Sequence, residues 1–213
     1  MQTSVATMVN VGTMNQGIGT WVVIKKEREK MIKGDSSEYD LLEKWSSLNC
    51  DGYKTVEIGV REGLGSKIIM DSAENYMMHI GIDPYGNLKY QHYDSAEPAQ
   101  YDYTDNMRDT MIKDFESYRG KFRFCNMTDK KFMVENPGYN VEYALVHFDG
   151  PHMTRDVMTE AIYFAERCAP FARFIFDDYP KYNMQLISDC LKPYGFSVME
   201  QGQNKICLEK QNT

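Results

Sequence analysis

Four stretches of the chain pass through β-forming residues and end in an acid. They are residues 55–57, 80–83, 145–149 and 174–178. In an open α/β sheet, ligands bind in the crevice beyond the carboxyl ends of the strands, so these acids are expected to converge there. Burying several carboxylates requires hydroxyl groups, backbone donors or a metal ion to satisfy them. The pattern therefore predicts a built site at one edge of a sheet.

A glycine-rich turn follows the first of these stretches. Gly59, Gly63 and Gly65 stand where a strand turns into a helix, so backbone amides can approach a ligand and the helix N-terminus points at negative charge. Their order is G-x-x-x-G-x-G, whereas pyrophosphate-binding folds carry G-x-G-x-x-G, which argues against a nicotinamide cofactor. Asp83 ends the next strand, where a carboxylate can accept both hydroxyls of a ribose.

Three later acids form a second constellation. Asp149, Asp177 and Asp178 come from the ends of adjacent predicted strands and suit a hard cation such as Mg²⁺, which prefers oxygen ligands. A metal there would lower the pKa of a bound hydroxyl group. The alternative is that these acids only cap the loops that follow them.

A histidine lies three residues after the first of these acids. His152 can take a proton from a hydroxyl group near neutral pH, or it can be a loop histidine that caps the helix at Thr154. His147, inside a strand, is expected to be a packed core residue. His79 and His92 carry no functional signal.

Alternating strands and helices must position these residues. Apolar residues recur at helical spacing in residues 41–48, 64–69, 107–115, 157–168 and 184–191, and strands are expected at 55–57, 76–83, 122–125, 143–149 and 171–177. Ser36 and Ser37 are expected to cap the first helix. Residues 196–200 and 205–209 look like a closing hairpin. The order predicts an α/β fold with a doubly wound, mostly parallel, Rossmann-like sheet and a C-terminal antiparallel hairpin.

Two segments interrupt this order. Residues 1–35 form an N-terminal arm or lid, a dimer arm that would make a homodimer, or a partly disordered segment, and these alternatives stay open. Residues 36–213 are expected to be a single domain. Its insertion at 85–120 carries many tyrosines and is either a lid over the substrate or a surface excursion packed on the core.

Composition excludes several classes of protein. The chain has 213 residues, 42% of them hydrophobic, which is enough for one full core, and a formal net charge of -7. That charge argues against nucleic acid as the main partner, and no apolar run is long enough to span a membrane. The five cysteines are scattered singly, so neither a zinc site nor a disulfide framework is indicated. We expect a cytoplasmic protein that acts on a small molecule.

The motifs together resemble a known family, the class I S-adenosylmethionine-dependent methyltransferases. Residues 56–66 (Val-Glu-Ile-Gly-Val-Arg-Glu-Gly-Leu-Gly-Ser) resemble their first motif, and residues 81–84 (Gly-Ile-Asp-Pro) their second. Residues 147–152 (His-Phe-Asp-Gly-Pro-His) and 175–179 (Ile-Phe-Asp-Asp-Tyr) resemble the signature of the metal-dependent O-methyltransferase branch, which includes methyltransferase family 24 and the macrocin O-methyltransferases. The likeness covers roughly residues 50 to 209 as an order of motifs.

The resemblance implies a site and an activity. It implies that S-adenosylmethionine is bound by Glu57, Gly59, Arg61, Gly63, Ser66, Asp83, Met127, Thr128 and Asp149. Arg61 stands where many metal-independent relatives have glycine, a departure that favours the metal-dependent branch. The resemblance further implies Mg²⁺ at Asp149, Asp177 and Asp178, with His152 and Asp149 as catalytic groups. His152 lies at the offset where the catechol O-methyltransferase branch carries its lysine base.

The implied reaction is transfer of a methyl group to a hydroxyl oxygen of a small sugar or phenolic acceptor. Two other functions stay open on the same residues. One is a non-catalytic cofactor-binding module, which would keep Glu57 and Asp83 without needing the three later acids. The other is a hydroxylase-like member of the same fold, which would share the acids and perform different chemistry.

Overall fold

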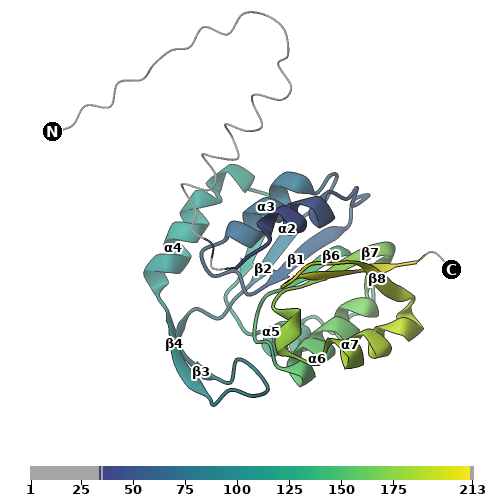
Figure 1. Ribbon diagram of the computed structural model, residues 1–213. Helices are drawn as coiled ribbons and strands as arrows, with labels where there is room; N and C mark the ends of the chain where they lie inside the picture. The colour runs from purple at the N-terminus through teal and green to yellow at the C-terminus, as the bar shows by residue number, and fades with distance from the viewer. Residues whose placement is uncertain (1–33, 35, 212–213) are drawn as a thin grey trace, which may run out of the picture. The chain divides into compact units, whose positions relative to one another are not determined.

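A mixed sheet of seven strands forms the centre of the structure, a computed structural model that describes residue 34 and residues 36–211 (Figure 1). The strands are β1 (Lys54–Ile58), β2 (His79–Ile82), β5 (Phe122–Cys125), β6 (Tyr143–Phe148), β7 (Cys168–Phe176), β8 (Phe196–Gln201) and β9 (Ile206–Lys210). Their order across the sheet is β5-β2-β1-β6-β7-β9-β8. The expectation for residues 1–35 concerns residues outside the described part, except Gly34.

The pairing of these strands confirms the predicted fold class. β5, β2, β1, β6 and β7 run parallel, whereas β9 pairs antiparallel with both β7 and β8. From β1 the chain proceeds outward to β2 and β5, and then returns to β6 on the other side of β1. The crevice at this reversal, beyond the carboxyl ends of β1 and β6, is where doubly wound sheets bind ligands.

Helices cover both faces of the sheet (Figure 1). They are α2 (Tyr39–Ser46), α3 (Leu64–Ser72), α4 (Asp105–Asp114), α5 (Asp129–Glu135), α6 (Thr154–Ala165) and α7 (Met184–Leu191), with short 3₁₀ turns at Glu116–Tyr118, Tyr179–Lys181 and Lys192–Tyr194. Successive residues of a strand point to opposite faces of the sheet, so β6 contributes side chains to two hydrophobic cores. Val146 belongs to the core that includes residues of α5, α6 and α7, and Leu145 to the core with Trp45 of α2 and Ile69 of α3.

Two local expectations are wrong. Ser36 and Ser37 do not cap the first helix, because its N-cap residue is Glu38, in a left-handed conformation and with no side-chain cap. The Glu38 carboxylate instead accepts hydrogen bonds from the backbone amides of residues 203–205 at 2.7 to 2.8 Å. The second strand begins at His79 and not at residue 76.

The insertion after β2 has structure that its sequence did not indicate. β3 (Gly86–Tyr90) and β4 (Ala99–Tyr103) form a separate antiparallel hairpin before α4. Tyr85, expected to belong to the lid, is buried, and its hydroxyl donates to the carbonyl of Arg61. The role of the rest of the insertion as a lid stays a prediction.

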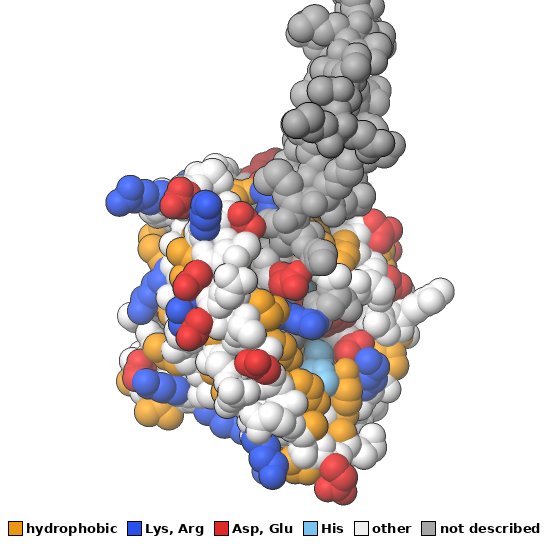
Figure 2. Space-filling view, turned by 90° about the vertical axis from the view of Figure 1, so that its left-hand side faces the viewer, with side chains coloured by type: hydrophobic (Ala, Val, Ile, Leu, Met, Phe, Trp, Pro, Cys, Tyr) orange, Lys and Arg blue, Asp and Glu red, His pale blue; other side chains and the backbone are white. Residues whose placement is uncertain are grey.

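The surface charges, the cysteines and the lengths of the helices were also part of the sequence-based expectations. Figure 2 shows acidic, basic and hydrophobic side chains interspersed over one face of the described residues. All five cysteines are free thiols, and four of them are buried. No helix within the described residues is long and apolar enough to cross a membrane.

Candidate active site

Glu57 lies at the carboxyl end of β1 and is held by two neighbours. The parallel register places it beside His147 of β6, whose Nδ1 lies 2.8 Å from Glu57 Oε1. The hydroxyl of Ser66 donates to the other oxygen, Oε2. Glu57, His147 and Ser66 are all buried, so the hydrogen bonds offset the cost of removing this carboxylate from water.

The hydrogen-bonded chain continues away from Glu57. Ser66 Oγ lies 2.9 Å from His79 Nε2, and His79 Nδ1 lies 2.8 Å from Thr55 Oγ1. Burial, with the nearby His147, lowers the pKa of His79 to about 3, so this ring is neutral. Sequence reasoning missed that His79 and His147 belong to this series of hydrogen-bonded side chains. Because Ser66 is fully buried, its role in this structure is to position Glu57.

The glycines of the turn are required by close backbone packing. Gly59 and Gly63 have φ values of 85° and 90°, a region that side chains disfavour. A Cβ atom on Gly59 would overlap the carbonyl of Asp149, and one on Gly65 would overlap the carboxylate of Glu57. The turn therefore presses against the strand ends that carry the predicted acids.

Asp83 ties the end of β2 to the same turn. Its Oδ2 accepts hydrogen bonds from the backbone amides of Val60 at 2.9 Å and Arg61 at 2.8 Å. Burial raises the pKa of Asp83 to about 6, although these amide donors act in the opposite direction. The guanidinium of Arg61 lies 5.7 Å from the ring centre of Tyr103 in the hairpin.

Met127 and Thr128 follow β5, the strand beside β2. Met127 is partly buried and packs against the larger core. Thr128 is exposed and caps α5, with its hydroxyl accepting from the amide of Lys131 at 3.2 Å. Both residues lie at the predicted edge of the sheet, and Thr128 has a structural role there.

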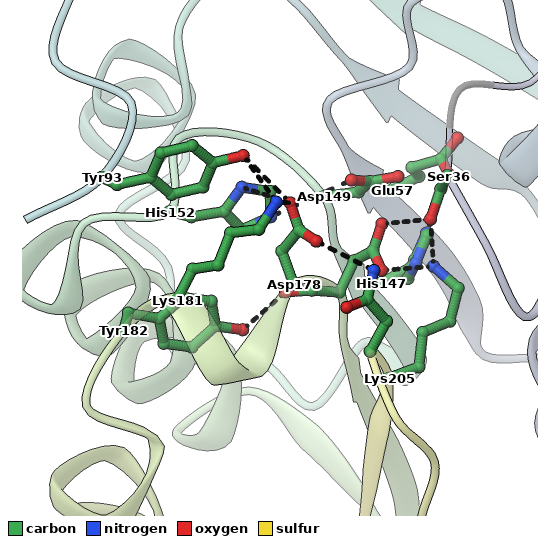
Figure 3. Close-up of polar contacts among 12 residues, drawn as sticks. Ser36, Glu57, Tyr93, His147, Asp149, His152, Asp178, Lys181, Tyr182 and Lys205 are labelled. Atoms are coloured by element: carbon green, nitrogen blue, oxygen red, sulfur yellow. Dashed lines mark hydrogen bonds and ion pairs between the residues drawn. The ribbon is translucent and has the colours of Figure 1, made fainter. Parts of the chain in front are cut away.

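Asp149 and Asp177, which follow β6 and β7, form the centre of the acid cluster. Figure 3 shows Asp149 together with Asp178 and Lys205. The two side chains of Asp149 and Asp177 are close enough for the negative charge of Asp177 to act on Asp149. Asp177 Oδ1 lies 2.7 Å from the ammonium nitrogen of Lys205, and Oδ2 accepts from Ser36 at 2.6 Å. Burial would raise the pKa of Asp177, but the ammonium group of Lys205 lowers it below its usual value. Burial and the negative charge of Asp177 raise the pKa of Asp149 well above its usual value.

Asp178 points its carboxylate at other partners. Its Oδ2 accepts from the hydroxyl of Tyr93 at 3.0 Å and from Lys181 at 2.9 Å, and its Oδ1 accepts from Asn204 at 3.1 Å. Its backbone is left-handed, with a φ of 50°. The bend after Asp177 therefore separates the directions of the two successive acids.

The predicted Mg²⁺ ligand set does not fit this geometry. Asp149, Asp177 and Asp178 are not brought together as three ligands, because protein donors occupy the oxygens of the last two. Among the described residues, the acids and histidines with ligand atoms within 4.8 Å of one another are Glu57, His147 and Asp149. Both oxygens of Glu57 are already hydrogen-bonded there. The structure thus does not support the metal prediction.

His152 is held between two tyrosine rings. It stacks on Tyr93 at 5.8 Å and on Tyr182 at 5.7 Å between ring centres, with interplanar angles of 11° and 4°. Its Nε2 lies 3.9 Å from Asp149 Oδ1, and neither ring nitrogen has a hydrogen-bond partner among the described residues. Burial, together with the neighbouring His92, lowers the pKa of His152 to about 4, so the ring is neutral.

The alternative role of His152 as a helix cap is wrong. The amide of Thr154 donates to Asp94 at 3.0 Å, and the hydroxyl of Thr154 donates to the same carboxylate. A partner from the insertion thus fills the position that His152 would have taken. His152 is left as a neutral, buried ring beside Asp149.

Comparison with known proteins identifies the fold. No protein-family model matches the chain, and no curated protein matches its sequence. A protein of Corynebacterium glutamicum is similar in structure, with a TM-score of 0.57, 14% identity, and coverage of 93% of this chain and 92% of that one. A Streptococcus mutans protein described as a methyltransferase in complex with SAH has a TM-score of 0.53 and 9% identity over 83% of this chain and 99% of that one. A Clostridium thermocellum protein described as an rRNA methylase has a TM-score of 0.55 and 11% identity over 84% and 98%.

The chain has a Rossmann-like fold, which it shares with these structures. Within this fold, Glu57, the glycine turn and Asp83 lie at the carboxyl ends of β1 and β2. Asp149 and Asp177 follow β6 and β7 at the same edge, so the two constellations expected from the sequence meet across the reversal of strand order.

Proposed function

We propose that this protein is an S-adenosylmethionine-dependent methyltransferase that methylates a hydroxyl oxygen of a small molecule. The observation that carries the proposal is the meeting of the glycine turn, Glu57 and Asp83 at the reversal of strand order. The turn offers backbone amides, Asp83 offers a carboxylate for ribose hydroxyls, and Glu57 lies in the adjacent strand. A non-catalytic module would not need the second constellation beside it.

In this proposal His152 is the group that accepts the proton of the acceptor hydroxyl. Its ring is neutral and its nitrogens have no hydrogen-bond partner within the part of the chain that the structure describes, so one of them can take the proton as the oxygen attacks the methyl carbon. The carbon–sulfur bond breaks while the carbon–oxygen bond forms, and the thioether leaves with the electron pair. Holding both reactants in line supplies much of the acceleration.

We propose that the acceptor is a small hydroxylated ring covered by the insertion. Tyr90 stacks on Tyr101 at 4.4 Å, and His92 connects this pair to Tyr93 and to His152 through ring contacts of 4.1 and 5.0 Å. An aromatic or sugar ring can stack on such side chains. The net charge of -7 and the mixed charges in Figure 2 favour a small acceptor over RNA, whose phosphates require a basic surface.

The first test of the proposal is calorimetry with SAH (S-adenosylhomocysteine, the demethylated form of the cofactor). NAD represents the competing class of cofactor. We expect SAH to bind and NAD not to bind. Asp83→Asn should weaken SAH binding by about tenfold or more, because a charge-assisted hydrogen bond to ribose is lost. Asp102→Asn is the matched control, since Asp102 is an exposed acid of β4. Equal SAH affinity of wild type and Asp83→Asn would overturn the cofactor assignment.

A screen with methyl-labelled S-adenosylmethionine then tests the reaction. We expect label to pass to hydroxylated aromatic or sugar acceptors and not to RNA. Transfer to RNA alone would contradict the small-molecule assignment. SAH binding with no transfer to any acceptor would favour the cofactor-binding module.

A further inference from the structure

Lys205 is a fully buried cation within the acid cluster (Figure 3). Its ammonium nitrogen lies 2.7 Å from Asp177 Oδ1 and 2.9 Å from the hydroxyl of Ser36. The same hydroxyl donates to the second oxygen of Asp177 at 2.6 Å, so the three groups form a closed ring of contacts. No part of Lys205 is exposed, and its ammonium group is occupied by Asp177 and Ser36. Its effect is exerted through Asp177.

The fold places this lysine by two independent constraints. The antiparallel pairing of β7 and β9 sets Phe176 opposite Ile206, and one further step along each strand sets Asp177 opposite Lys205. The turn before β9 is fixed by Glu38, whose carboxylate accepts the amides of residues 203–205. The same stretch of chain supplies Ser36. Lys205 is therefore held beside Asp177 by the pairing of β7 with β9 and by the segment that carries Ser36 and Glu38.

Two of the three acids of the cluster are paired with lysines. Lys205 pairs with Asp177 at 2.7 Å, and Lys181 pairs with Asp178 at 2.9 Å. A divalent cation bound to Asp177 would lie close to the ammonium of Lys205, and like charges at such a distance repel strongly when both are buried. Removing Lys205 would leave the buried carboxylate of Asp177 without its cation.

We propose that Lys205 takes the place of a divalent cation in this acid cluster. It orients Asp177 and balances the charge of that carboxylate, so Lys205 is a positioning residue and the cluster binds no metal. It follows, on the basis of the proposed function, that methyl transfer by this protein does not depend on Mg²⁺. It also follows that loss of Lys205 raises the affinity of Asp177 for a divalent cation.

Measuring Mn²⁺ binding tests this proposal without any assay of activity. The electron paramagnetic resonance signal of the free ion reports how much Mn²⁺ remains unbound. We expect Lys205→Ala to bind Mn²⁺ about tenfold or more tightly than wild type, because a like charge has been removed. Adding Asp177→Asn to that variant should abolish the gain. Lys54→Ala, which breaks the 2.5 Å ion pair with Glu142 elsewhere in the sheet, should bind Mn²⁺ as wild type does. Equal Mn²⁺ affinity of wild type and Lys205→Ala would overturn the proposal.

Two further measurements keep the test decisive. If Lys205→Ala does not fold, Lys205→Gln, which retains a donor for Asp177, is measured in its place. The wild-type thermal midpoint is also measured in EDTA and in Mn²⁺. We expect the same value in both, whereas a rise in Mn²⁺ that Asp177→Asn removes would show a native metal site and refute the proposal. Because these measurements need no cofactor, failure of SAH binding would leave their outcome intact.

Discussion

Replacing Lys205 by methionine removes the buried cation while keeping the length of the side chain. At 2.7 Å, the attraction between Lys205 and Asp177 is about 6 kcal/mol for an effective dielectric constant of about 20. The desolvation of both ions offsets part of this attraction. Breaking such a pair by removing one partner costs about 3 to 5 kcal/mol, because the other charge stays buried. We therefore expect Lys205→Met to lower the free energy of unfolding by about that amount at neutral pH.

The loss should depend on pH with a defined sign. In wild type the pKa of Asp177 is lowered, so the pair contributes stability above the unfolded pKa of about 4, and that contribution disappears as the pH falls further. In Lys205→Met, burial without the ammonium raises the pKa of Asp177, so the acid takes up a proton and its penalty is relieved on acidification. The difference between the two proteins should be largest near pH 7 and shrink toward about pH 4.

Urea unfolding at several pH values measures this difference, and a double-mutant cycle isolates its cause. Asp177→Asn removes the stranded charge, so the double variant Lys205→Met/Asp177→Asn should regain about 2 to 4 kcal/mol relative to Lys205→Met alone. For a domain of this size, the single variant should melt roughly 6 to 20 °C below wild type. A loss below about 1 kcal/mol, or additive effects of the two substitutions, would refute the buried ion pair as the source of stability.

Three other predictions concern the crevice. SAH affinity, measured by calorimetry, should fall as the pH is lowered from about 7.5 to about 5. Burial raises the pKa of Asp83 to about 6, and a protonated acid accepts hydrogen bonds poorly. A Kd that stays constant over this range would contradict the prediction. His152→Ala should lower kcat by about 10² to 10³ with SAH affinity unchanged. Since burial lowers the pKa of His152 to about 4, wild-type kcat at saturating cofactor should stay level down to about pH 5, and an inflection near 6.5 would exclude this histidine as the base. Gly65→Ala should destabilise the protein by about 1 to 3 kcal/mol, because its Cβ would overlap Glu57, while Gly138→Ala, which meets nothing within 4 Å, serves as the control.

Local sequence patterns predicted much of the fold. Apolar periodicity located α6 and α7, and runs of β-forming residues located β1 and β6 close to their observed bounds. β7 was expected from residue 171 but begins at Cys168, which apolar periodicity assigned to the preceding helix. The missed elements are short and polar. α5 has seven residues, of which only Asp129 and Phe132 are buried, and the β3–β4 hairpin has no fully buried residue. Such elements form because they pack on neighbours, and that packing leaves a weak periodic signal.

Parallel topology explains why the sequence alone located the acids of the site. The carboxyl ends of parallel strands lie at the same edge of a sheet, so Glu57, Asp83, Asp149 and Asp177 had to converge once the alternation of strands and helices was recognised. The glycine turn was likewise determined locally, by the space that Gly65 leaves for Glu57.

Only the tertiary structure decided what surrounds these acids. Lys205 reaches Asp177 because of the register between β7 and β9 and because Glu38 fixes the turn before β9. His147 meets Glu57 through the pairing of β6 with β1. These partners come from segments far apart in the chain, and a shift of register by one residue would turn Lys205 to the opposite face of the sheet. Residue types predicted a magnesium ion beside the acids, whereas the register places a lysine there.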